Sequence, residues 1–237
     1  MGGFIAGTTI TLFLAFERIT IASALIVFYT FPVWVAIAAV PLFGEHLGRR
    51  KSAAIALSGV GLVMLLAAPT AGGSGLDLVG VALALGASLC QTGFALVGAG
   101  GFRSVPALQS ATLARLFSAL IYVVFLLPLL LLLGQGGTIA DPVGSGDAWG
   151  LILMAGVIGA AIPSVLIIAG YRRLGPTRGA VLMLVEPVTG VFLAAMLLAE
   201  QPTVIQLVGG LFVLVGAGVV QFAPVTRPGA TLQPTAE

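Results

Sequence analysis

The chain has 237 residues, of which 59% are hydrophobic and only 8% charged, with a formal net charge of +2 and a mean hydropathy of +1.18. A soluble domain carries roughly a quarter charged residues, so this composition excludes an ordinary water-soluble protein. The single cysteine, Cys90, excludes a disulfide within the chain, and the single histidine, His46, argues against a site of clustered metal ligands. The sequence has no basic patch with interleaved aromatic residues, so nothing in it indicates nucleic-acid binding.

Apolar runs of about 20 residues, the length that crosses a ~30 Å hydrocarbon core, repeat along the chain. A β-barrel would instead show alternating strands of about ten residues. The fold class is therefore predicted to be all-α membrane protein, with Pro/Thr-rich residues 225–237 as a disordered tail. About eight transmembrane helices are expected near residues 2–17, 20–43, 51–69, 77–98, 106–133, 148–171, 178–199 and 203–222.

The loop charges predict the orientation. With Met1 in the cytoplasm, only Arg18 falls on the outer side and only Arg115 within a span. The positive-inside rule therefore places both termini in the cytoplasm of a multi-pass protein, which we expect in the plasma membrane. The other eight basic residues lie inside: Arg49, Arg50, Lys51, Arg103, Arg172, Arg173, Arg178 and Arg227.

Residues 19–69 and 174–224 align without a gap at a shift of 155 positions, which pairs Pro32 with Pro187 and Gly61 with Gly216. The two copies run in opposite directions in this topology, as in the inverted repeats of secondary transporters. We expect a partial first repeat of three helices in 1–69 and a second repeat of five in 77–224. By this count two helices, roughly 80 residues, would precede Met1, and the reading frame would be truncated or mis-started.

Both copies combine a mid-helix proline, a helix-ending glutamate (Glu45, Glu200) and a Gly-rich last helix. The segments are PVWVAIAAVPLFGEHL followed by GVGLVML, and LVEPVTGVFLAAMLLAEQPTVIQLVGGLFVLVGAGV. This pattern resembles the EamA-like domains of the drug/metabolite transporter superfamily. The resemblance implies a ten-helix carrier of a kind that often exports amino acids or other metabolites. This chain departs from that pattern because counterparts of the first two helices are missing, which counts against transport by the chain on its own.

Glu186 is the first candidate for chemistry. It precedes Pro187 and lies about eight residues, or ~12 Å, from Arg178 at the membrane edge. A carboxylate facing lipid at that depth is costly, so Glu186 should face a cavity or a partner and could exchange a proton. Pro187 is expected to leave the carbonyl of Met183 without its usual donor. The alternative is a structural carboxylate bonded to a neighbouring helix.

Arg115 lies at a similar depth, where it is expected to pair with Glu186, to bind a substrate carboxylate, or to snorkel to the inner interface. Pro32 is expected to break its helix near the midplane, although its copy has Phe31 where the other has Glu186. For each further candidate, the alternative to a solute-binding role is a hydrogen bond between helices or simple space filling in the core. These substrate-binding candidates are Tyr29 and Trp34 beside Pro32, and Gln91, Phe94, Tyr122 and Ser164 on other spans.

These features predict a secondary active transporter that exports a small polar metabolite such as an amino acid, coupled to protons, in a lipid bilayer. The alternatives are a truncated, non-transporting membrane fragment or scaffold, and a membrane enzyme. With no nucleophile–base set, phosphate-binding loop or metal-ligand spacing, we expect no catalysis, cofactor or metal. Rows of small residues predict close helix packing or a homodimer contact: Ala54, Ser58, Gly61, Gly209 and Gly216.

Overall fold

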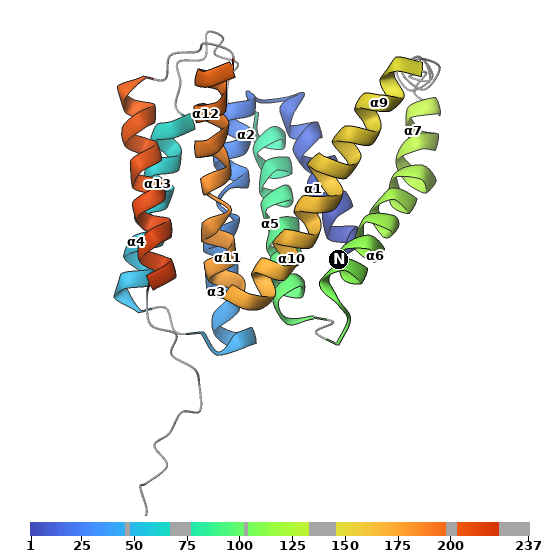
Figure 1. Ribbon diagram of the computed structural model, residues 1–237. Coiled ribbons are helices and arrows are strands. Elements are labelled where there is room, and N and C mark those ends of the chain that lie inside the picture. Colours follow the sequence, from blue (N-terminus) through green and yellow to red (C-terminus); the bar gives the residue numbers. More distant parts are fainter. Residues whose placement is uncertain (46–47, 67–76, 102–103, 133–145, 198–202, 223–237) are drawn as a thin grey trace, which may run out of the picture.

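The computed structural model describes residues 1–45, 48–66, 77–101, 104–132, 146–197 and 203–222. All regular elements in this part are helices, packed side by side as a bundle (Figure 1). They are α1 Gly2–Phe16, α2 Ile21–Phe28, α3 Phe31–Phe43, α4 Arg49–Leu66, α5 Leu78–Gly100, α6 Ala107–Ile121, the π-helix η1 Tyr122–Leu126, α7 Leu127–Leu132, α9 Gly146–Met154, the π-helix η2 Ala155–Ala161, α10 Ile162–Leu174, α11 Pro176–Leu182, α12 Val185–Leu197 and α13 Val204–Phe222.

Within the residues that the structure describes, four segments are long and apolar enough to cross a membrane: Ser23–Phe43, Leu78–Gly100, Ala107–Leu126 and Ala148–Leu174. Together with the large apolar side chains exposed along them, these segments confirm an all-α membrane protein. The expected tail at 225–237, His46 and Glu200 lie outside the described residues.

Two of the predicted spans are each broken into two helices. The break between α2 and α3 falls at Tyr29 and Thr30, and the break between α11 and α12 falls at Met183 and Leu184. Each is followed within three residues by a proline, which cannot donate a backbone hydrogen bond. The carbonyl of Met183 lacks its usual donor because of Pro187, but it is not free, since the amide of Glu186 donates to it at 3.0 Å. A tight turn satisfies the group that the proline would have left unpaired.

Helices α4 and α13 lie side by side and run in opposite directions (Figure 1). A Cβ on Gly61 would lie 2.5 Å from the carbonyl oxygen of Gly209, and a Cβ on Gly216 would lie 2.7 Å from that of Ala54. Under the shift of 155, Ala54 corresponds to Gly209 and Gly61 to Gly216, so each contact mirrors the other. Reciprocity of this kind characterises interfaces around a two-fold axis. We call this contact the α4–α13 seam.

The helix boundaries follow the same shift. Helices α2 and α4 begin at Ile21 and Arg49, and α11 and α13 begin 155 positions later, at Pro176 and Val204. Figure 1 shows that α2–α3 runs in the direction opposite to α11–α12. The predicted small-residue rows thus pack against each other within the chain.

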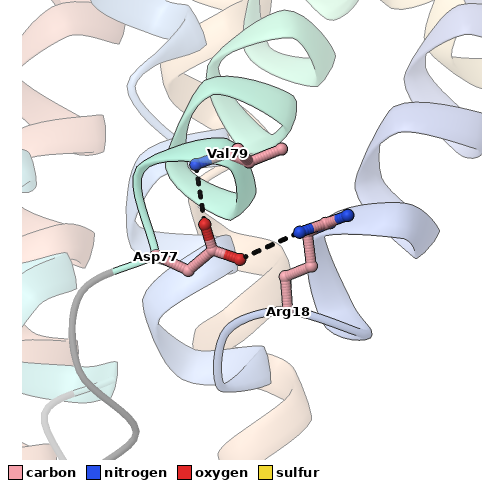
Figure 2. A network of polar contacts seen from close by, with 3 residues as sticks. All are labelled: Arg18, Asp77 and Val79. Carbon is pink, nitrogen blue, oxygen red and sulfur yellow. Dashed lines mark hydrogen bonds and ion pairs between the residues drawn. The ribbon is translucent and has the colours of Figure 1, made fainter.

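The end of α1 is clamped to the start of α5 (Figure 2). Asp77 caps α5 by accepting a hydrogen bond from the amide of Val79 at 2.9 Å, and its other oxygen lies 3.3 Å from the guanidinium of Arg18. The Val79 bond, helped by Arg18, holds the pKa of Asp77 below its ordinary value. A Cβ on Gly80 would lie 2.7 Å from Ile19, so the two helices are in close contact here.

At the other end of the bundle, Glu45 pairs with Lys51 at 3.6 Å. Its carboxylate also lies close to Gly175, where a Cβ would be 3.4 Å from Glu45 Oε1. Gly175 has a φ of +83°, a conformation that favours glycine, in the turn between α10 and α11. Glu45, which lies between α3 and α4, therefore packs against the turn between α10 and α11.

Candidate functional site

A cavity of about 310 Å³ lies between α1, the α2–α3 break, α5, α6, α10 and the α11–α12 break. Two other cavities, beside Phe117 and beside Ile55, have almost entirely apolar walls. The first cavity has charged and polar groups on several sides, which small polar solutes require. It is lined by Ile5, Thr8, Thr9, Leu12, Leu25, Phe28, Tyr29, Phe31, Gln91, Phe94, Arg115, Ser164, Ile167, Met183 and Glu186.

Six of the ten predicted site residues line this cavity, from five different helical segments: Tyr29, Gln91, Phe94, Arg115, Ser164 and Glu186. The other four do not. Pro32 is fully buried at the start of α3, and Pro187 is half-buried behind Glu186. Trp34 lies on an exposed face of α3, where its indole nitrogen donates to Thr30 at 3.2 Å. Tyr122 begins η1 and does not line the cavity, but it lies near the guanidinium of Arg115.

The two broken spans meet at this cavity. Tyr29 ends α2 at one break, and Glu186 lies in the first turn of α12 at the other. The Tyr29 hydroxyl lies close to the Glu186 carboxylate. Glu186 is exposed and lines the cavity. Its carboxylate therefore faces the cavity.

Arg115 on α6 approaches the cavity from another side. Its Nε donates to the Ser164 hydroxyl at 2.7 Å, and that hydroxyl donates to the carbonyl of Ala160 at 2.6 Å. The ion pairs within the described residues join Arg18 to Asp77 and Lys51 to Glu45, and neither involves Arg115. A direct pair between Arg115 and Glu186, one of the expected alternatives, is therefore not formed. The two opposite charges line one cavity without bonding each other.

Sequence reasoning missed three residues at the site. Thr8 and Thr9 line the cavity from α1, and their adjacent hydroxyls in an otherwise apolar helix were the available signal. Tyr171 lies behind Phe94, with the ring centroids 6.4 Å apart in an edge-to-face contact. It is only 1% exposed, and its hydroxyl lies close to Gln91. No sequence pattern pointed to Tyr171.

In the described part of the chain, no three His, Cys, Asp or Glu side chains lie close enough together to hold a metal ion. Among the described residues, the charged groups that line the cavity are one carboxylate, Glu186, and one guanidinium, Arg115. Such a pair can bind a polar solute by hydrogen bonds and opposite charges, and the carboxylate can carry a proton.

Comparison with known proteins agrees with this architecture. Residues 78–222, more than half of the chain, match the model of the EamA-like transporter family. A solved structure described as "Crystal structure of protein" superposes with a TM-score of 0.74 at 22% identity, over 92% of this chain and 72% of its own. No curated protein matches the sequence. The chain belongs to the EamA-like transporter family and is a multi-pass membrane transporter of the drug/metabolite transporter superfamily.

Proposed function

We propose that this protein is a secondary active transporter that exports a small polar metabolite such as an amino acid, coupled to protons, through the cavity lined by Glu186 and Arg115. The observation that carries the proposal is the placement of these opposite charges in one cavity of about 310 Å³. Charged residues within membrane spans are costly and commonly mark a solute or proton pathway.

In this mechanism the solute enters beside Glu186 and Arg115, and Glu186 takes up a proton on one side of the membrane and releases it on the other. Two units, 1–69 and 77–224, rock against each other so that the cavity opens alternately to each side. The boundaries shared at a shift of 155 and the reciprocal α4–α13 seam support this division into inverted repeats. The loop charges favour cytoplasmic termini in the plasma membrane.

The test uses the purified chain in proteoliposomes, with a ³H-labelled mixture of L-amino acids as the solute and an imposed pH gradient as the driving force. The wild-type protein should accumulate label only when the gradient is present. Glu186→Gln should abolish this flux because an amide cannot exchange the proton. Size-exclusion chromatography should show that the variant inserts and folds normally.

Glu17→Gln is the matched control, since Glu17 follows α1 at an exposed position outside the cavity lining. It should transport like the wild type. Unchanged flux in Glu186→Gln would contradict the proton role of Glu186. No flux of any amino acid by the wild-type chain would contradict amino-acid export and favour the alternative of a non-transporting fragment or scaffold.

A further inference from the structure

The guanidinium of Arg115 is held from one side only. Its Nε donates to the Ser164 hydroxyl, and within the described residues this is the single hydrogen bond that the guanidinium makes. The two terminal nitrogens make no hydrogen bond in the part of the chain that the structure describes, although Tyr122 lies close enough to the guanidinium to interact with it electrostatically. Arg115 is half-buried and lines the cavity. A desolvated cation with unused donors needs an acceptor, and a solute in the cavity can supply one.

Ser164 is fixed in the orientation that Arg115 requires. A serine hydroxyl has one proton to donate and can accept through its lone pairs. The proton goes to the carbonyl of Ala160 at 2.6 Å, so the lone pairs remain for the Nε–H group of Arg115. Ser164 is only 2% exposed, so it has almost no surface of its own for a solute. Ser164 therefore influences a bound solute by holding the side chain of Arg115.

The backbone just before Ser164 is a π-helix. In η2 the amide of Ile162 donates to the carbonyl of Val157, five residues earlier instead of four. The wider turn changes the direction in which the following side chains point, and π-helical turns occur frequently at functional sites. The acceptor of the Ser164 proton, Ala160, belongs to this segment. The π-helix thus sets both the direction of Ser164 and the partner that holds it.

We propose that Ser164 is a positioning residue that holds Arg115 with its two terminal nitrogens toward the cavity, where they bind the carboxylate of the solute. This inference rests on the proposed function, because it takes the cavity to be the solute site. An arginine fork matches a carboxylate with two parallel hydrogen bonds. Glu186 lines the same cavity and complements an amino group, so the solute class is the zwitterionic α-amino acid.

The test measures binding to the purified full-length chain in detergent, as the rise in unfolding temperature with probe concentration. The probes are L-leucine and L-phenylalanine, each compared with its own amide, which keeps the amino group and lacks the carboxylate. The wild-type protein should bind the acids about tenfold more tightly than the amides, and Ser164→Ala should remove about that factor for the acids only.

Ser118→Ala is the matched control. Ser118 lies on α6 and is 3% exposed, but its hydroxyl donates to the backbone carbonyl of Arg115 at 2.9 Å instead of contacting the guanidinium. This variant should keep the acid-over-amide preference. Arg115→Lys tests the same geometry without changing Ser164, and it should lose the preference because an ammonium lacks the planar fork.

A wild-type protein that does not prefer the acids would overturn the inference. So would equal weakening of acid and amide by Ser164→Ala, which is the signature of a merely structural serine, or a full preference in Arg115→Lys. The proteoliposome assay reports separately on transport. Carboxylate-selective binding without flux would contradict the proposed function alone, whereas flux without selectivity would contradict the role of Ser164 alone.

Discussion

The two broken spans, α2–α3 and α11–α12, occupy corresponding positions at a shift of 155 and differ in charge at the residue before the proline. In α3 that residue is Phe31, which is 1% exposed, belongs to the main hydrophobic core and contributes an apolar part of the cavity wall. In α12 it is Glu186, whose carboxylate is exposed on the cavity. Similar backbone breaks thus serve packing in one span and place a charge in the other. The difference teaches that the geometry of the break does not by itself create the site.

The helices that follow the two breaks are alike. Across the α4–α13 seam, Gly61 and Gly216 make mirrored contacts with the opposite backbone. The backbone contacts of the seam are therefore symmetric, whereas the residues before the two prolines differ in charge at the cavity. The following changes test this contrast, beginning with the one expected to have the largest effect.

Exchanging the residues before the prolines should give opposite results. Phe31→Glu replaces a 1%-exposed aromatic ring of the main core with a carboxylate, so we expect no folded protein. Glu186→Phe changes an exposed cavity residue and should yield folded protein without proton-driven flux. Fluorescence-detected size-exclusion chromatography after expression measures the folded fraction of each. Normal folding of Phe31→Glu would show that the two breaks are interchangeable.

Gly61→Ala and Gly216→Ala should destabilise the protein by similar amounts, about 1–3 kcal/mol each, because the added methyl overlaps the opposite helix. Gly59→Ala and Gly218→Ala are matched controls on the same helices, where a Cβ meets nothing within 4 Å. Thermal unfolding in detergent measures the four variants. A large effect at only one of the two seam glycines would contradict the symmetric seam.

Asp77→Asn should have the smallest effect. It weakens the clamp between α1 and α5, but the Arg18 and Asp77 side chains are 51% and 32% exposed, so solvent screens the pair. The folded pKa of Asp77 lies below its ordinary value of 3.8, so its stabilisation is present above that value and is lost as the pH falls through the folded pKa. Unfolding temperatures measured across this range should fall with acid in the wild type and less so in Asp77→Asn. An identical acid response in both proteins would exclude a contribution from this carboxylate.

The sequence by itself determined the membrane class, the approximate spans and the two breaks. These features depend on local properties: apolar runs long enough to cross the bilayer, and prolines that lack an amide donor. The placement of Glu186 on a cavity also followed from a local argument, because a carboxylate at that depth is too costly to face lipid.

The tertiary structure alone decided which side chains meet. Arg115 and Ser164 are 49 positions apart, and their contact depends on the rotation of two helices and on the π-helix η2, which no apolar pattern encodes. Trp34 could be expected near Pro32 but faces outward, and Tyr171 went unnoticed behind Phe94. In a nearly uniform apolar sequence the side that faces the cavity and the side that faces lipid look alike, so only the packing of the helices separates them.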